Sequence, residues 1–445
     1  MTGGDGNRLS LKSRAGKVSK QRVIFFLSIC VYKLIIEFVY LNRISPLFSY
    51  SLLTTNIDLS KMIYSWAICT LICIVHPTDP NRPSTYLFLL MTLIMWIPLS
   101  SYYWMNNQNS AYMSCELLCV LVIALWCRAN RKRFFMEKSV SHSVFDFLFV
   151  IYVLITIYLI AKRGGIDSRA LDFKNVYQIR SEYDNLGSID GYLVNWSAKA
   201  FFPVMSSYMF IRKKKIPLVM TFLLQIGLYS AYAYKAFLAS AVLLLLLFIL
   251  IQKKNNIKRI VSAFNIGNIA AYVLDILGIT EALRAFLPYR TLFIPAKNQF
   301  HYYEYFSSHA FLQLSGSTFG RLLFSEYQYD RPIGYIVEAY FINSGSNGNT
   351  GVFSYGFADF GFAGMLAVAL IVGFLFWFID STTYNMPVFL TVGALSYWVV
   401  TMNDNSLLIT LVTGGFLILL IMLMLLNTCD LVQDNEKNNA YERSK

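Results

Sequence analysis

The chain has few charged residues. Asp, Glu, Lys and Arg make up 14% of its 445 residues, whereas hydrophobic residues make up 56%. This composition excludes an ordinary soluble globular protein and indicates a polytopic membrane protein. Common catalytic motifs are also missing: there is no phosphate-binding lysine loop, dinucleotide-binding glycine fingerprint, nucleophile elbow or His-Glu-x-x-His helix. These absences argue against nucleotide-driven transport, redox chemistry and metalloproteolysis.

Cysteine is missing from the segments expected outside the membrane. The seven cysteines lie in hydrophobic segments or at their ends: Cys30, Cys69, Cys73, Cys115, Cys119, Cys127 and Cys429. No extracellular disulfide framework is therefore expected. Two cysteine pairs are spaced i,i+4, Cys69 with Cys73 and Cys115 with Cys119. No histidine is positioned to complete a metal site with either pair, so these cysteines are interpreted as packing residues. The outer segments also contain no Asp-x-Asp pair. We expect no metal and no other cofactor.

Positive charge is in excess and clustered. The formal net charge is +13, and four basic runs border hydrophobic segments: residues 8–22, 128–133, 212–215 and 253–259. By the positive-inside rule these runs mark the cytoplasmic face. They are short and lack a nucleic-acid-binding motif, so we expect them to contact anionic lipid headgroups and expect no nucleic-acid partner.

The hydrophobic segments predict an all-α polytopic integral membrane protein with about 12 transmembrane helices. The predicted spans are 22–41, 62–76, 84–105, 111–127, 144–162, 192–211, 216–231, 235–252, 260–280, 355–379, 387–402 and 405–427. Residues 1–21 and 428–445 are expected to be cytoplasmic tails, and 22–427 a single membrane domain. Basic runs at both ends of 216–252 predict a hairpin with its tip near Tyr232 to Lys235.

Two long segments, 163–191 and 282–354, are predicted as outer loops. The second is much longer than ordinary connections and is expected to contain helices and a function. In the first, Arg163, Arg169 and Arg180 run against the positive-inside bias. A guanidinium fork binds diphosphate oxygens bidentately, so we predict that these arginines bind an anionic, lipid-linked substrate. The alternative is a solvated loop in which acidic neighbours pair with them. Lys235 could likewise contact a headgroup or extend to the membrane interface.

The second outer loop combines cations with the aromatic run His301-Tyr-Tyr-Glu-Tyr-Phe306. Such residues form stacking and hydrogen-bonding surfaces for sugars, or an aromatic belt at the membrane interface. His309 could accept a proton near neutral pH, or could be structural. The predicted catalytic residues in this loop are Arg290, Glu304 and His309, and the predicted substrate-binding residues are Arg284, Arg321, Tyr302 and Tyr303.

Two further charged positions have simpler explanations. Lys33 and Glu37 are spaced i,i+4 inside the first span and are expected to neutralise one another as a structural pair. Asn403-Asp-Asn405 occupies a short outer turn and is expected to be solvated rather than bound to a metal.

Four motifs lie between residues 290 and 364: Arg290-Thr-Leu-Phe-Ile-Pro295, His301-Tyr-Tyr-Glu-Tyr-Phe-Ser307, Ser346-Asn-Gly-Asn-Thr350 and Tyr355-Gly-Phe-Ala-Asp-Phe-Gly-Phe-Ala-Gly364. With these motifs and two large outer loops, the chain resembles bacterial oligosaccharide repeat-unit polymerases, the O-antigen and capsular polysaccharide polymerases. Some members carry an arginine followed after fifteen residues by glycine in both loops. The arginines of the two outer loops in this chain are not followed by glycine at that spacing, so catalytic arginines are assigned by their position in the outer loops alone.

The resemblance implies a metal-independent glycosyltransferase of multi-spanning, GT-C-like architecture. Such an enzyme transfers a growing glycan from undecaprenyl diphosphate onto a new lipid-linked repeat unit at the outer face of the bacterial inner membrane. The protein must then neutralise charge on the leaving diphosphate and orient the acceptor hydroxyl. Asp359 would be the base or a sugar ligand, and Asn347, Asn349 and Tyr355 would bind the glycan. The alternative for Asp359 is capping, because it is expected near a helix N-terminus. Independently of the resemblance, Gly356, Gly361 and Gly364 at the entry to a span predict a close backbone approach or an irregular first turn. The implied partners are undecaprenyl-diphosphate-linked glycans, membrane lipids, a chain-length regulator and a flippase.

Three alternatives remain open at this point. An O-antigen ligase shares the architecture but transfers the glycan to a lipid A core. A flippase or other transporter of lipid-linked oligosaccharide suits the number of spans, but such proteins usually have short loops and two related halves. A membrane acyltransferase would need a histidine within the membrane, whereas His76, His142, His301 and His309 are predicted outside the spans or at their ends.

Overall fold

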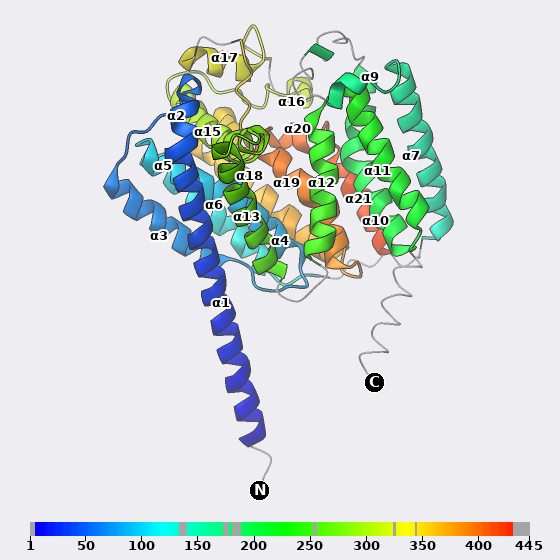
Figure 1. Ribbon diagram of the computed structural model, residues 1–445, viewed down its shortest axis with the longest axis horizontal. Coiled ribbons are helices and arrows are strands. Elements are labelled where there is room, and N and C mark those ends of the chain that lie inside the picture. Colours follow the sequence, from blue (N-terminus) through cyan, green and yellow to red (C-terminus); the bar gives the residue numbers. More distant parts are fainter. Residues whose placement is uncertain are drawn as a thin grey trace.

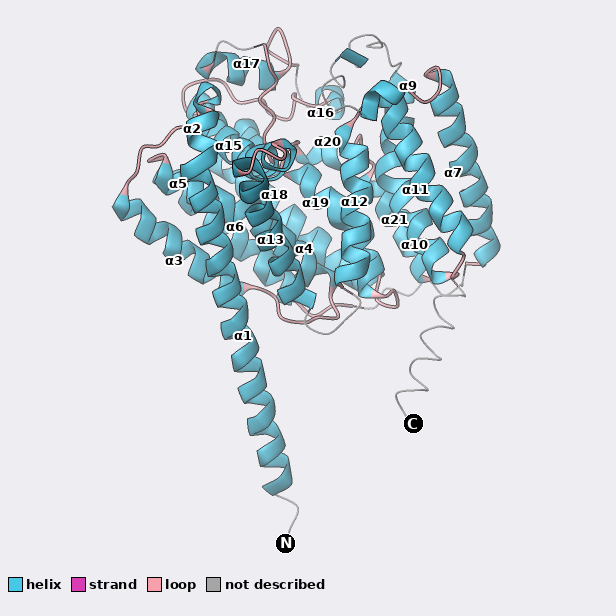
Figure 2. Cartoon of the chain, viewed as in Figure 1, coloured by secondary structure: helices cyan, strands magenta, loops and turns pink. Residues whose placement is uncertain are grey.

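The computed structural model describes residues 5–132, 140–171, 178–179, 188–251, 256–323, 326–342 and 345–429, and in these residues it contains helices and loops but no β-strand (Figures 1 and 2). The helices up to residue 211 are α1 (Asp5–Val39), α2 (Ser45–Leu47), α3 (Leu59–Val75), α4 (Pro83–Met91), α5 (Ile97–Met105), α6 (Ser110–Arg128), α7 (His142–Lys162), α9 (Ser188–Trp196) and α10 (Phe202–Ile211). Those that follow are α11 (Lys215–Tyr232), α12 (Lys235–Leu250), α13 (Asn256–Ile276), α14 (Ala282–Arg284), α15 (Ile294–Phe306), α16 (Thr318–Leu323), α17 (Ile333–Phe341), α18 (Val352–Thr382), α19 (Val388–Met402), α20 (Leu407–Leu411) and α21 (Phe416–Asn427). Two short 3-10 turns, η2 (Ser49–Ser51) and η4 (Ser168–Leu171), complete the set.

Four π-helical segments join consecutive α-helices into longer rods. They are η1 (Tyr40–Ile44), η3 (Thr92–Trp96), η5 (Ser197–Phe201) and η6 (Ala285–Phe293). Each is followed within two residues by a proline: Pro46, Pro98, Pro203 or Pro295. Proline cannot donate a backbone hydrogen bond and its ring crowds the preceding turn, so the helix widens locally instead of breaking.

The structure confirms a helical membrane protein. Among the described residues, five segments are long and apolar enough to cross a membrane: Gln21–Leu47, Pro83–Met105, Ser110–Arg128, His142–Lys162 and Val352–Thr382. Large apolar side chains remain exposed on the outer helices, as at Phe147, Val150, Leu154 and Ile157 of α7. Such a surface suits lipid rather than water. The other predicted spans correspond to shorter or less apolar helices, and the count of about 12 stays a prediction.

The basic runs gather at one end of the molecule. α1 begins and α21 ends at this end, whereas α9, α16 and α17 lie at the opposite end (Figure 1). Contacts tie the runs to their neighbours here: Arg128 donates to the carbonyl oxygen of Ile74, Arg131 stacks on Tyr384, and Arg212 pairs with Asp146. The two predicted outer loops thus lie at the end away from the basic runs.

The two local predictions inside the bundle are confirmed. α11 ends at Tyr232 and α12 begins at Lys235, with Ala233 in the left-handed conformation at φ 54°, so 216–252 is a hairpin. Lys33 Nζ lies 2.7 Å from Glu37 Oε1, and both residues are buried. Hydroxyl groups complete the network, because Ser65 and Ser101 accept from Lys33 at 2.8 and 2.9 Å. A buried pair satisfied in this way is structural.

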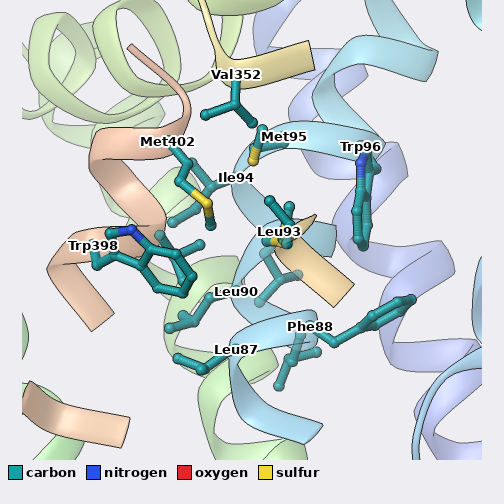
Figure 3. Close-up of a cluster of buried hydrophobic side chains, with 14 of the residues drawn as sticks. Leu87, Phe88, Leu90, Leu93, Ile94, Met95, Trp96, Val352, Trp398 and Met402 are labelled. Atoms are coloured by element: carbon teal, nitrogen blue, oxygen red, sulfur yellow. The ribbon is translucent and has the colours of Figure 1, made fainter. Parts of the chain in front are cut away.

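The rod formed by α4, η3 and α5 runs through the centre of the bundle. All of its residues in Pro83–Met105 are buried. Figure 3 shows Leu90 and Ile94 of this rod facing Trp398 and Met402 of α19, with Val352 at the start of α18 above them. The outer ends of α18 and α19 therefore meet over the same central rod, and this meeting point positions the candidate site.

Candidate functional site

The second predicted outer loop folds into helices, as expected from its length. α15 is its central element and is buried along most of its length, including three polar residues, Lys297, Asn298 and Gln299. It packs against α5, α17 and α18. The loop is therefore a folded part of the bundle, and the polar side chains on α15 are held inside it.

α18 is broken near its outer end. Phe360 has φ −147° and ψ 26°, and Gly361 has φ 63° and ψ −149°, a left-handed conformation that favours glycine. The break lets Gly356 and Gly364 approach closely: a Cβ on Gly364 would lie 1.9 Å from the carbonyl oxygen of Gly356. The prediction that glycines here permit an irregular turn and a close approach is confirmed.

Asp359 lies immediately before this break, two turns into α18, rather than near a helix N-terminus as the sequence suggested. The loop after α15 hydrogen bonds to this point. The backbone N–H of Leu312 donates to the carbonyl oxygen of Ala358 at 2.8 Å, and that of Leu314 donates to Asp359 Oδ1 at 2.8 Å. The carboxylate is half-buried and held in a fixed orientation by its backbone donor.

Tyr355, one helical turn before Asp359, lies close to two other tyrosines, Tyr302 and Tyr327. The Tyr302 hydroxyl lies 3.4 Å from the Tyr355 hydroxyl, and both rings are buried. Tyr327 donates to the carbonyl oxygen of Arg331 at 2.8 Å, and the Arg321 guanidinium lies 5.5 Å from the Tyr327 ring centre. Burial raises the pKa of Tyr327 to about 12, so its phenol is neutral at neutral pH. Neutral phenols can both donate to and accept from sugar hydroxyls.

Lys297 and Glu338 form a second polar contact on α15. Lys297 Nζ lies 3.6 Å from Glu338 Oε1 of α17 and 3.1 Å from the carbonyl oxygen of Ser51, to which it donates. Lys297 is 1% exposed. Burial lowers the pKa of Lys297, and the Glu338 carboxylate opposes this shift. Sequence reasoning missed the pair of Lys297 and Glu338. The sequence did offer one indication of it, because Lys297 is spaced i,i+4 from His301 in a helix with few charges.

Asn347 and Asn349 lie in a loop packed between α15 and α17. Asn298 Nδ2 donates to the carbonyl oxygen of Asn349 at 2.7 Å. The N–H of Gly348 donates to the carbonyl oxygen of Gly334 at 3.0 Å. A Cβ on Gly334 would lie 1.9 Å from Asn347 Oδ1, so the loop touches α17 directly. The Asn-Gly-Asn motif therefore packs against α15 and α17, and its contact with a glycan stays a prediction.

Arg290 lies in η6, which continues directly into α15 as one rod, and is exposed. Within the described part of the chain, no hydrogen bond or salt bridge holds its guanidinium. The next residue is anchored, because Asn403 Nδ2 donates to the carbonyl oxygen of Thr291 at 3.1 Å. Asn403 is 2% exposed, so the expectation of a solvated 403–405 turn is wrong for this residue. Packing against Thr291 is the physical reason. The hydrogen bond also holds Asp404, overlooked as a site residue, within electrostatic range of Arg290.

The structure separates the predicted catalytic and substrate-binding residues along the rod formed by η6 and α15. Tyr302 lies 12 residues after Arg290, and Glu304 lies 14 after it, which corresponds to roughly 18 and 21 Å of helix. His309 follows α15; it is exposed and stacks on Tyr305 with ring centres 3.9 Å apart. Glu304 is also exposed. The arrangement is therefore elongated, with a cation at one end and phenols and a carboxylate at the other.

Two predicted binding residues of this loop have structural partners. Arg284 pairs with Asp275, which also accepts from Arg43 Nε at 2.6 Å, and with Glu281 at 3.2 Å. Its charge is therefore compensated between α13 and α14. Tyr303 packs against Phe357 with ring centres 5.0 Å apart. These contacts within the protein explain the positions of both side chains, and their role in substrate binding stays a prediction.

The first outer loop forms a separate polar surface at the tip of the α11–α12 hairpin. The Arg163 guanidinium lies 5.2 Å from the Tyr232 ring centre, and Arg169 pairs with Asp167 at 2.8 Å. Both arginines line a shallow pocket of about 250 Å³. Lys235 begins α12 at the same tip. Arg180 lies outside the described residues. Pairing of Arg169 with Asp167 agrees with the solvated-loop alternative for that residue.

Comparison of the chain with protein-family models, curated proteins and solved structures finds no match. The resemblance to repeat-unit polymerases therefore stays a hypothesis, to be judged on these residues and their geometry.

Proposed function

We propose that this protein is a metal-independent glycosyltransferase that polymerises undecaprenyl-diphosphate-linked repeat units into O-antigen or capsular polysaccharide. The proposal places both tails in the bacterial cytoplasm, about 12 spans in the inner membrane, and the second-loop site at the outer face. Support for this orientation comes from the four basic runs, which share the end of the molecule opposite the site.

The observation that carries the proposal is the elongated arrangement on η6, α15 and α18. Arg290 offers a guanidinium without a partner among the described residues, and Tyr302, Tyr355 and Asp359 offer hydroxyl and carboxylate groups further along the rod. An acceptor or donor that is anionic at one end and carries sugars at the other would match this order of groups. A lipid-linked oligosaccharide diphosphate has that chemistry.

In the proposed reaction, an acceptor hydroxyl attacks the anomeric carbon of the donor glycan. A new carbon–oxygen bond forms, the bond to the diphosphate breaks, and the hydroxyl proton passes to a base. Arg290 neutralises the charge that develops on the diphosphate, a contribution that in other enzymes amounts to roughly 10²–10³-fold in rate for one donor. Tyr302, Tyr355 and Asp359 hold the sugars.

Deletion of the gene in its native bacterium tests the function. Loss of a polymerase should convert long polysaccharide ladders into single repeat units on a gel, and expression of the wild-type chain should restore them. A normal ladder in the deletion strain would overturn the proposal. Unligated long chains accumulating on undecaprenyl diphosphate would identify a ligase, and repeat units trapped at the inner face would identify a flippase.

A further inference from the structure

The turn between α19 and α20 lies beside η6, the segment that carries Arg290. Asn403 donates to the carbonyl oxygens of Thr291, at 3.1 Å, and of Ile94, at 3.4 Å. The start of α18 closes on the same turn, because a Cβ on Gly351 would lie 3.0 Å from the carbonyl oxygen of Met402. Figure 3 shows Val352 above Ile94 and Met402 next to Ile94. Asp404 is thus held beside η6 by contacts that do not involve its own side chain.

The other polar side chains of this turn have structural partners. Asn405 Nδ2 donates to the carbonyl oxygen of Thr401 at 3.3 Å, and Ser406 Oγ accepts from the N–H of Ile409 at 3.3 Å. Asp404 differs: in the described part of the chain its carboxylate accepts no hydrogen bond and makes no salt bridge. It is nevertheless half-buried. Neither a helix-capping role nor an ordinary surface position explains why this carboxylate is half-buried without a partner among the described residues.

The charged and titratable groups that face Asp404 among the described residues are Arg290 of η6 and Tyr397 of α19. Burial raises the pKa of Asp404, and the positive charge of Arg290 opposes that shift. The ionised carboxylate therefore depends on an arginine that is itself exposed and free to bind an anion. Lys297 also lies within electrostatic range of Arg290, so the surroundings of the guanidinium are cationic.

We infer that Asp404 takes up a proton when an anionic lipid diphosphate binds to Arg290. The diphosphate would neutralise the charge that stabilises the carboxylate and would add a negative charge beside it. Both changes favour the neutral acid. No other reactant is needed, since the proton comes from solvent. This inference rests on the diphosphate-binding part of the proposed function.

Calorimetry with farnesyl diphosphate as the probe tests the inference. Binding to the full-length protein in lipid nanodiscs is measured at one pH in two buffers of different ionisation enthalpy, which yields the protons taken up. Wild type should take up about one proton more than Asp404→Asn, because linkage requires the loss of that titrating group. Subtracting the proton uptake of Asp404→Asn from that of wild type removes the protons that the probe itself gains or loses on binding. Asp330→Asn, which changes an exposed aspartate at the same end, should behave as wild type.

Equal proton uptake by wild type and Asp404→Asn would overturn the inference and leave the polymerase proposal intact. Absence of probe binding by wild type would overturn both the inference and the diphosphate site, whatever the deletion strain shows. If Asp404→Asn does not fold, the infrared difference spectrum of wild type replaces it. A new carboxylic-acid C=O band on probe binding supports the inference, provided that Asp404→Glu shifts the band, and its absence contradicts it.

Discussion

The carbonyl oxygen of Gly356 packs against Gly364 across the break in α18, so closely that no side chain fits between them. Gly361 supplies the left-handed turn that makes this approach possible. The short first segment of α18 is thereby folded onto the second, and Asp359 is placed at the junction beside the loop after α15. The geometry of the proposed sugar site thus depends on three glycines.

Substitution Gly364→Ala should destabilise the protein and reduce activity. The added Cβ would lie 1.9 Å from the Gly356 carbonyl oxygen, which is backbone and cannot rotate away. Overpacking of this kind typically costs about 1–3 kcal/mol. Thermal unfolding in detergent measures the effect. Gly345→Ala is the matched control, because a Cβ there meets nothing within 4 Å, and equal melting temperatures for the two variants would contradict the prediction.

Substitution Arg290→Ala should abolish polymerisation while the protein level is retained. Lysine should rescue poorly, since a point charge does not reproduce the bidentate fork. Glycan ladders from the deletion strain expressing each variant provide the measurement, and Arg331→Ala, an exposed arginine of the same segment, is the control. Wild-type ladders from the alanine variant would remove Arg290 from the site. Full activity of Arg290→Lys would reduce it to a membrane anchor.

Stability should fall on acidification because of His301. Burial, followed by the charge of Lys297, lowers the pKa of His301 to about 3, compared with an ordinary value of about 6.5. Below pH 6.5 the unfolded chain binds a proton that the folded protein excludes, so stability decreases with falling pH and levels off near pH 3. The loss between pH 6.5 and 5 should be about 2 kcal/mol. Melting curves of His301→Phe, which keeps the stack on Phe341, should be less acid-sensitive.

His309→Phe is the comparison for this experiment, because it removes an exposed imidazole while keeping the stack on Tyr305. Its pH profile should match that of wild type. An unchanged profile for His301→Phe would show that the buried imidazole is not the source of the acid sensitivity.

Labelling of single cysteines in a cysteine-free variant should report the orientation. Ser168→Cys and Ser307→Cys, both exposed at the end that carries the outer loops, should react with a membrane-impermeant maleimide in intact cells. Lys214→Cys and Ser141→Cys at the basic end should react only after the cells are opened. Labelling of Lys214→Cys from outside would reverse the proposed topology.

Activity should be independent of divalent metal ions. The outer segments contain no Asp-x-Asp pair, and guanidinium groups can neutralise a leaving diphosphate instead. The purified protein should polymerise lipid-linked repeat units equally well with and without EDTA. Inhibition by EDTA that Mg²⁺ or Mn²⁺ reverses would contradict this and direct attention to Glu182 and Asp184.

Sequence alone determined the helical membrane class, the hairpin at 232–235, the Lys33–Glu37 pair and the glycine-dependent break in α18. Each depends on properties local to the chain: hydrophobic length, the sign of flanking charge, i,i+4 spacing and the conformational freedom of glycine. Local patterns also pointed to Arg290 and Tyr302, because cations and aromatic residues stand out in a loop predicted to face outward. The resemblance to repeat-unit polymerases pointed to Tyr355 and Asp359.

Tertiary structure alone decided which of these residues come together. Lys297 meets Glu338 from another helix, and Tyr327 approaches Arg321 near the Tyr302–Tyr355 pair. Asn403, far along the sequence, hydrogen bonds to the residue that follows Arg290. These contacts arise where the outer ends of separate helices meet over the central rod. No periodicity or spacing encodes that meeting, because it depends on the packing of apolar faces whose partners are distant in sequence.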